Sequence, residues 1–219
     1  MAIKPILFNT EMVEAILSCR KTQTRRIIKP QPSNPRWNNI GWLGWDDGHG
    51  YRMKSPCEPG DILWVRETWR PAKGAMHELI WGRLVESNNW HDGFEYKDGF
   101  YHFPDGFEES GDLSHLSEIR SIGKWHPSIH MPKEAARIFL LVKDVRLEKL
   151  NDILAHAGEV AKEGIPYSDE GDIEASGLRF KELWDSTINQ ADLGEYGWYA
   201  NPWVWVIEFE RCDKPEGWC

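Results

Sequence analysis

Long apolar runs are missing from this sequence. No stretch within its 219 residues approaches the roughly 20 consecutive apolar residues that a membrane-spanning helix needs. Residues 1–5 contain no charged region followed by an apolar one, which is the pattern of a secretory signal. We therefore expect a cytoplasmic protein with no membrane partner. The length suits one large domain, or a small domain that carries an insertion.

Cysteine is scarce and scattered. The four cysteines form no CxxC pair, so the sequence signals neither a zinc site nor a disulfide framework (Cys19, Cys57, Cys212 and Cys219). His126 and His130 resemble a metal pair only superficially, because no carboxylate-rich helix frames them. We expect reduced cysteines, no metal ion and no cofactor.

Positive charge is also in short supply, since the formal net charge is −9. The acidity is concentrated in residues 86–118, where nine acids face one base, Lys97, and the local balance is −8. The rest of the chain has 25 bases and 26 acids, and its bases cluster near the N-terminus (Arg20, Lys21, Arg25, Arg26 and Lys29). Contact with nucleic acid therefore stays open, because binding to phosphates depends on clustered Lys and Arg.

The N-terminal pattern predicts a strand, a helix and a second strand. Residues 4–8 form a short apolar run, and Asn9 or Thr10 can cap the helix that follows it, up to about Cys19. Residues 22–28 alternate with a period of two and predict a strand. Lys21 thus lies at a helix-to-strand junction.

Further along, strands alternate with irregular segments and a few helices. Residues 30–60 are rich in proline and glycine and indicate an irregular, partly packed excursion, and residues 71–128 indicate an irregular acidic, aromatic insertion with a hairpin at 94–103. We predict strands at 62–67, 136–148 and 203–210, and helices at 151–163, closed by Gly164 and Pro166, and at 176–189. The fold class is α+β, in one domain over residues 1–219, and a small barrel would hide the strand edges.

Several segments resemble the ASCH family, a branch of the PUA-like β-barrels. The resemblance rests on residues 16–26 (ILSCRKTQTRR), 59–67 (PGDILWVRE) and 202–209 (PWVWVIEF), in that order. Residues 127–133 (PSIHMPK) and 161–165 (AKEGI) are similar to longer members often encoded in phages and prophages. The resemblance to the ASCH family implies a PUA-like mixed β-barrel with flanking helices. One departure is Cys19, where the family usually has Gly before Arg20.

The resemblance also implies an activity. The relatives include small amidohydrolases that remove the acetyl group from N4-acetylcytidine, and their catalytic Lys, Thr and Glu correspond here to Lys21, Thr24 and Glu163. In that chemistry Thr24 supplies the attacking oxygen and Lys21 takes its proton, provided that burial or nearby cations keep part of Lys21 neutral. Glu163 passes a proton to the leaving nitrogen. Arg26 or backbone N–H groups stabilise the oxyanion.

Other residues are candidates for ligand binding. Arg20, Arg25 and Arg26 can contact phosphates, and Glu67 can line a pocket or pair with Arg66 or Arg26. Most of the thirteen tryptophans belong in a core, but Trp69, Trp42 and Trp45 lie in irregular segments and are candidates for a wall that stacks on bases.

Three functions stay open. The first is a hydrolase that acts on a modified pyrimidine nucleoside or a nucleotide in RNA. The second is a non-catalytic nucleic-acid reader, and the third is a phage accessory protein whose acidic insertion mimics nucleic acid. Against all three stands a structural interpretation, in which residues 21–26 are a charged strand alternating into solvent and Glu163 is a solvated surface side chain.

Overall fold

The computed structural model describes residues 1–38, 44–80, 83–102, 116–156, 158–165 and 173–218. Two compact units are formed by segments that alternate along the chain. Unit 1 consists of residues 1–2, 15–62 and 141–210, and unit 2 of residues 3–14, 63–140 and 211–219. None of the described helices is long and apolar enough to cross a membrane.

The largest sheet has five strands in the order β1 (Ile3–Leu7), β5 (Ile62–Arg66), β10 (Phe139–Lys149), β11 (Trp203–Cys212) and β2 (Gln23–Ile27). Its pairing is mixed. The Ile62 N–H bonds to the carbonyl of Ala2 and the Phe8 N–H to that of Arg66, so β1 and β5 are parallel, whereas β11 and β2 are antiparallel. All five strands agree with the sequence-based prediction. The expected α+β class is confirmed, with a sheet-rich core and few helices.

In unit 1, the register between β2 and β11 separates the side chains into two faces. Arg25 is paired with Val206, and Thr24 with Ile207. Because directly opposed residues of an antiparallel pair share a face, Gln23, Arg25 and Ile27 project to one side and Thr24 and Arg26 to the other. We call the first side the helix face and the second side the tryptophan face.

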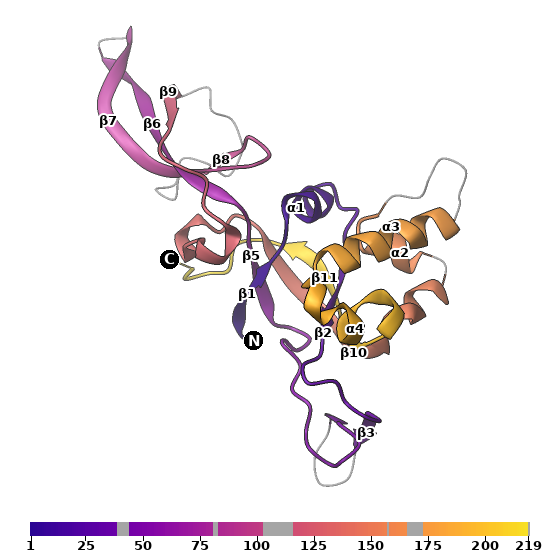
Figure 1. The fold of residues 1–219 in the computed structure, drawn as a ribbon. Helices are drawn as coiled ribbons and strands as arrows, with labels where there is room; N and C mark the ends of the chain where they lie inside the picture. The colour runs from indigo at the N-terminus through magenta and orange to yellow at the C-terminus, as the bar shows by residue number, and fades with distance from the viewer. Residues whose placement is uncertain (39–43, 81–82, 103–115, 157, 166–172, 219) are drawn as a thin grey trace. The chain divides into compact units, whose positions relative to one another are not determined.

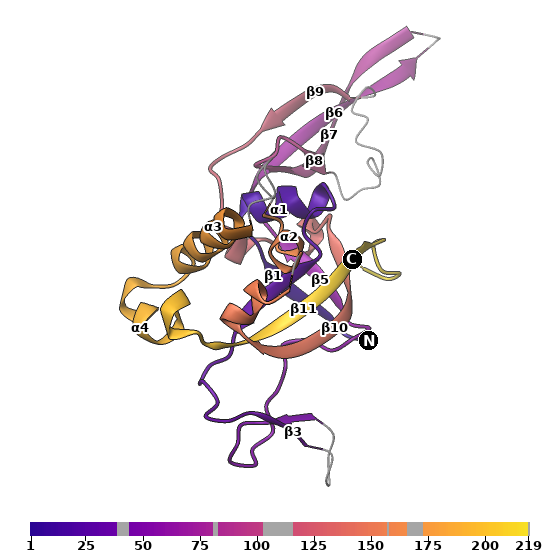
Figure 2. The ribbon, with the colours of Figure 1, turned by 90° about the vertical axis from the view of Figure 1, so that its right-hand side faces the viewer.

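Helices cover the apolar part of the helix face. Val204 and Val206 pack into a core with residues of η3 (Leu150–Leu154), α2 (Glu159–Lys162), α3 (Ile173–Ser186) and η5 (Trp198–Ala200). Two short helices, η4 (Gln190–Asp192) and α4 (Leu193–Tyr196), lie between α3 and η5 in the sequence. In Figures 1 and 2 these helices gather beside β2 and β11. On the tryptophan face, Trp205 forms a second core with Ile28 and Leu147.

Two of the three expected helices are confirmed and one is wrong. Helix α1 (Thr10–Leu17) is capped by Asn9, whose Oδ1 accepts the Met12 N–H at 2.8 Å, and α3 covers most of the predicted second helix. The continuous helix expected over 151–163 is interrupted. Gly158 has φ +94, so η3 ends before it and α2 begins after it. Gly164, with φ +88, ends α2 as predicted, whereas Pro166 lies outside the described residues.

The expected irregular excursion over 30–60 contains a small ribbon. Strands β3 (Arg36–Asn38) and β4 (Gly44–Asp46) pair antiparallel, and Trp37 lies opposite Trp45. A backbone bridge between Asp46 and Arg52 continues the pairing on the other side of β4. The ribbon therefore belongs to unit 1 and provides ordered backbone for aromatic side chains.

The description of residues 71–128 as irregular is wrong for most of the segment. In unit 2, β6 (Trp69–Ile80), β7 (Arg83–Tyr96), β8 (Tyr101–His102) and β9 (Leu116–Ser121) form a sheet in the order β8-β7-β6-β9. Figure 1 shows β6 and β7 as a long twisted ribbon. The predicted hairpin over 94–103 is confirmed, since Phe94 pairs with His102. A register shift near Ala75 breaks the alternation, which explains why no sustained period was visible.

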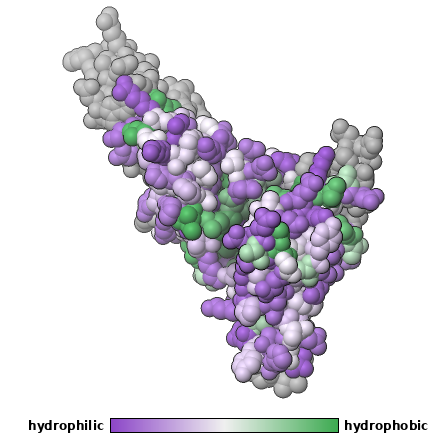
Figure 3. Space-filling view, in the orientation of Figure 1, coloured by the Kyte–Doolittle hydropathy of each residue, from purple (hydrophilic) through white to green (hydrophobic). Residues whose placement is uncertain are grey.

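Two short 3-10 helices, η1 (Ser128–His130) and η2 (Lys133–Ala135), connect β9 to β10 within unit 2. Among the described residues, Cys19, Cys57 and Cys212 form no disulfide with one another. On the face drawn in Figure 3 the described surface is mostly hydrophilic, with hydrophobic residues in small separate areas.

Candidate active site

A tight turn after α1 places Lys21. Cys19 adopts φ +58, a conformation that favours glycine, and the N–H groups of Arg20 and Lys21 both donate to the carbonyl of Ala15, at 2.8 and 2.9 Å. Cys19 therefore occupies the left-handed position of this turn. This turn directs Lys21 toward the end of α2.

Lys21 meets Glu163 in the interior of unit 1. Its Nζ donates to Glu163 Oε2 at 2.8 Å and to the Glu163 carbonyl at 2.9 Å, and the two backbones form an isolated β-bridge. Only 2% of Lys21 and 5% of Glu163 are exposed. Glu163 therefore pairs with a buried cation, and the interpretation of Glu163 as a solvated surface side chain is wrong.

Gly164 allows this close approach. A Cβ atom at Gly164 would lie 2.8 Å from the Cβ of Ala15 and 3.0 Å from that of Lys21, and real Cβ atoms almost never come so close. The residue also has φ +88. Both the end of α2 and the packing of Lys21 against it therefore depend on the missing side chain.

Arg25 connects Glu163 to a larger set of charges. Its Nη1 donates to Glu163 Oε1 at 2.7 Å, and its Nη2 lies 3.2 Å from Glu148 Oε2 and 3.3 Å from Glu159 Oε2. Arg146 pairs with Glu148, Glu159, Glu208 and, at the exposed rim, Asp144, and Lys162 pairs with Glu159. We call this set the charge cluster (Lys21, Arg25, Asp144, Arg146, Glu148, Glu159, Lys162, Glu163 and Glu208).

Gln23 supports the charge cluster from β2. Its Nε2 donates to Glu159 Oε2 at 2.9 Å, and its Oε1 accepts from Arg146 at 3.1 Å. Gln23 is fully buried, and Arg25 is almost so. The interpretation of residues 21–26 as a strand that alternates into solvent is therefore wrong at these positions.

Burial changes the proton affinity of Lys21. Desolvation lowers its pKa from the usual 10.5, Glu163 opposes this effect, and repulsion from Arg26 and Arg25 adds to it. The net direction is downward. Repulsion from Arg25 and Arg26 acts in the same direction as burial, which is the larger cause. A lowered pKa is what a Lys needs to act as a general base.

Arg20 does not share this environment. It is exposed, its Nε donates to Ser18 Oγ, and its Nη1 donates to the carbonyl of Gly164 at 3.0 Å. Its guanidinium therefore fixes the loop after α2.

Thr24 and Arg26 lie on the tryptophan face, away from Arg25. Thr24 is buried opposite Ile207, so its side chain lies on the side of β2 opposite to Arg25. Burial lowers the pKa of Arg26, with Glu163 opposing that effect. The structure therefore brings together Lys21 and Glu163 but not the expected attacking hydroxyl.

Glu67 and Trp69 belong to unit 2. Glu67 accepts a bidentate pair from Arg137, at 2.9 and 2.7 Å, and Arg137 also pairs with Asp98. Burial raises the pKa of Glu67, and the hydrogen bonds from Arg137 oppose this. The expected partners Arg66 and Arg26 are thus wrong. Trp69 starts β6 and stacks on His126, with ring centroids 4.8 Å apart.

Of the other two tryptophans proposed to stack on bases, the structure describes one. Trp45 lies in β4 and packs against the core of the tryptophan face, whereas Trp42 lies outside the described residues. Among the residues that the structure describes, no group of three or more His, Cys, Asp or Glu side chains is arranged to hold a metal ion.

Sequence reasoning missed most partners in the charge cluster. Arg146 and Glu148 alternate on one side of β10, and Glu208 lies on the neighbouring strand β11. Charged rows of this kind on adjacent strands are a signal for cross-strand ion pairs, and they could have indicated the cluster. No protein-family model, curated protein or solved structure matched the chain. The structure itself shows an α+β protein with a buried cluster of Lys, Glu and Arg side chains.

Proposed function

We propose that this chain is an ASCH-type, PUA-like protein that binds a modified pyrimidine nucleoside or a nucleotide in RNA and hydrolyses an N4-acyl amide. The observation that carries the proposal is the buried contact between Lys21 and Glu163, with the Lys21 pKa lowered. The mixed five-stranded sheet is compatible with a PUA-like barrel. The segment resemblance supplies the substrate class.

Different side chains of unit 1 carry out the successive steps of amide hydrolysis. An oxygen attacks the acetyl carbonyl carbon, and neutral Lys21 takes the proton of that oxygen. Arg26 or backbone N–H groups stabilise the oxyanion. When the C–N4 bond breaks, Glu163 passes the proton from Lys21 to the nitrogen, and cytidine leaves. Because Lys21 and Glu163 are nearly buried, neighbouring side chains must move to admit the amide.

Two sources of the attacking oxygen are compatible with this scheme. Thr24 would form an acetyl ester that water then hydrolyses, whereas a water molecule would give acetate directly. Thr24 lies on the opposite face of β2 from Arg25, so use of its hydroxyl requires a local change of β2. Direct attack by water requires no such change.

Incubation with N4-acetylcytidine, followed by chromatography for cytidine, tests the proposal. We expect turnover that falls about 10²- to 10⁴-fold in Lys21→Met, because a general base of this kind contributes that much. Turnover should also rise with pH up to the lowered pKa of Lys21, since only neutral Lys accepts a proton. Loss of activity in Thr24→Ala would identify the hydroxyl as the nucleophile, and retention would identify water.

Lys143→Met is the matched control, because Lys143 pairs with Glu210 and both are exposed. It should keep the wild-type rate. No turnover by the wild type, or equal rates for the wild type and Lys21→Met, would exclude the hydrolase and leave the reader function.

A further inference from the structure

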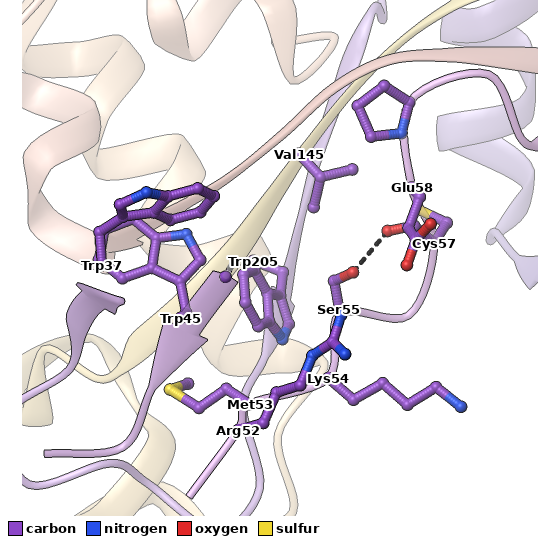
Figure 4. Close-up of a pocket in the computed structure, with 12 residues that line it drawn as sticks. Trp37, Trp45, Arg52, Met53, Lys54, Ser55, Cys57, Glu58, Val145 and Trp205 are labelled. Atoms are coloured by element: carbon purple, nitrogen blue, oxygen red, sulfur yellow. Dashed lines mark hydrogen bonds between the residues drawn. The ribbon is translucent and has the colours of Figure 1, made fainter. Parts of the chain in front are cut away.

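A second site lies in unit 1, between the β3–β4 ribbon and the tryptophan face. It is a cavity of about 610 Å³ and is lined by residues of β3, β4, the segment 52–59, β10 and β11. Figure 4 shows Trp37 and Trp45 at one end and Cys57 and Glu58 at the other, with Trp205 and Val145 between them. This volume falls within the range of small-ligand sites.

Aromatic rings form one wall of the cavity. Trp37 and Trp45 face the same side of the ribbon and contact each other edge to face, with centroids 5.5 Å apart and planes at 80°. Trp45 and Met53 pack against buried Trp205, which fixes the base of the wall. Trp37 is 53% exposed. It therefore offers a ring that a planar ligand can stack on.

The ribbon that carries Trp37 is held in place by a buried carboxylate. Asp46 is 1% exposed and accepts from Arg36 Nε and from the N–H of Gly48. The Met53 N–H donates to the carbonyl of Trp45 at 2.8 Å. The wall is thus anchored on both sides of β4, so little conformational entropy is lost when a ligand stacks on it.

Two cationic side chains also line the cavity. Arg52 and Lys54 are exposed side chains of the cavity, and one carboxylate, Glu58, lies at the end away from Trp37. An adjoining cavity of about 300 Å³ shares Arg52 and Lys54 and adds Tyr51, which is 74% exposed. Exposed rings that alternate with cations are the features that bind unpaired bases and their phosphates.

Other ligand classes fit less well. A sugar would use the rings but has no need of the cations, and a protein partner of ordinary size would need a broader apolar surface. The surface around β3 in Figure 3 is largely hydrophilic on the face drawn. Aromatic and cationic groups together favour a nucleotide chain.

We propose that this cavity is a stacking site for an unpaired nucleobase of single-stranded nucleic acid, in which Trp37 stacks on the base and Arg52 and Lys54 contact the flanking phosphates. The site is distinct from Lys21 and does not depend on hydrolysis there. The same chemistry is present in RNA and in single-stranded DNA, so the affinity for each is measured, and the tighter of the two identifies the ligand.

Fluorescence anisotropy of a labelled adenosine RNA of about 12 nucleotides, within the length that one single-strand binding module covers, measures the affinity. We expect Trp37→Ala to weaken binding about tenfold or more and Trp37→Phe to restore part of it. Lys54→Gln should weaken binding. It should also reduce the slope of the logarithm of the binding constant against the logarithm of salt concentration by about 0.7. Glu58→Gln should strengthen binding, because it removes a like charge from the phosphates.

Tyr199→Ala is the control for aromatic loss, since Tyr199 is 85% exposed and lies outside both cavities. It should bind like the wild type. The proposal is overturned if Trp37→Ala binds both RNA and single-stranded DNA as tightly as the wild type does. It is also overturned if the wild type binds neither nucleic acid. Stronger binding to duplex RNA than to the single strand also overturns it.

The same variants separate this site from the proposed hydrolase. Trp37→Ala should hydrolyse free N4-acetylcytidine at the wild-type rate, because that nucleoside reacts at Lys21. A protein that binds the RNA through Trp37 and fails to hydrolyse the nucleoside would retain this site and lose the proposed activity.

Discussion

Glu159 is held as a carboxylate by four neighbouring side chains. It accepts hydrogen bonds from Gln23, Arg25, Arg146 and Lys162. Burial raises the pKa of Glu159, but the hydrogen bonds from Lys162 and Gln23 outweigh it and lower the pKa to about 2. Its ionised form therefore contributes to the stability of the folded state.

This lowered pKa predicts a dependence of stability on pH. The folded pKa lies below the usual value of 4.5, so the contribution is present above pH 4.5 and is lost as the pH falls toward 2. Glu159→Gln should lower the free energy of unfolding at neutral pH and flatten its decline over that window. Urea unfolding at several pH values measures both effects. Equal declines in wild type and variant would contradict the assignment, and Glu210→Gln serves as the exposed control.

Prediction from sequence identified two residues that contact each other, but not the direction of most side chains around them. The resemblance assigns Lys21 and Glu163 to one catalytic set, and the two side chains are in contact. Arg25 was expected to contact phosphate, yet its terminal nitrogens contact carboxylates that lie more than 120 positions away. Partners this distant depend on strand register, which local periodicity does not reveal.

At the scale of elements, the end of α2 depends on one glycine. We predict that Gly164→Ala destabilises the protein more than Gly60→Ala does, although both glycines have φ +88. A Cβ at Gly60 meets nothing within 4 Å, so it bears only the left-handed cost of about 1–2 kcal/mol. At Gly164 the contacts with Ala15 and Lys21 add about 1–3 kcal/mol of overpacking. Urea unfolding of the two variants measures the difference, and equal losses would show that Gly164 does not hold Lys21 in place.

Elements were predicted well where a pattern was continuous and poorly where a single residue interrupts it. Strands β10 and β11 coincide with apolar runs in the sequence, and both predictions are confirmed. The break at Gly158 was missed because a glycine inside a helix costs only about 1 kcal/mol, so a helical pattern tolerates it. Strands β6 and β7 were missed because the irregularity near Ala75 disrupts their period.

At the scale of the whole molecule, acidity and the candidate site are separated along the chain. Residues 86–118 carry nine acids, whereas every member of the charge cluster belongs to unit 1. The long ribbon of β6 and β7 lies in unit 2. We therefore expect the site chemistry to be independent of residues 76–89.

Shortening that ribbon tests this separation. Ala75 pairs with Trp90, so residues 76–89 can be replaced by Asn-Gly, which favours a two-residue hairpin turn. We expect unchanged hydrolysis of N4-acetylcytidine and unchanged RNA affinity, as measured by chromatography and anisotropy. A loss of either activity in a variant that melts like the wild type would show that the acidic segment takes part in function.

The charge cluster has a consequence for ligand choice. Its four basic side chains face five carboxylates, so the cluster has no net positive charge to attract an anion (Lys21, Arg25, Arg146 and Lys162 against Asp144, Glu148, Glu159, Glu163 and Glu208). A phosphate brought to Lys21 would compete with carboxylates that already hold the cations, whereas an uncharged amide would leave those pairs intact. We therefore expect the interior of unit 1 to favour an uncharged amide over a phosphate, and the proposed stacking site to contact a nucleotide's phosphates through Arg52 and Lys54.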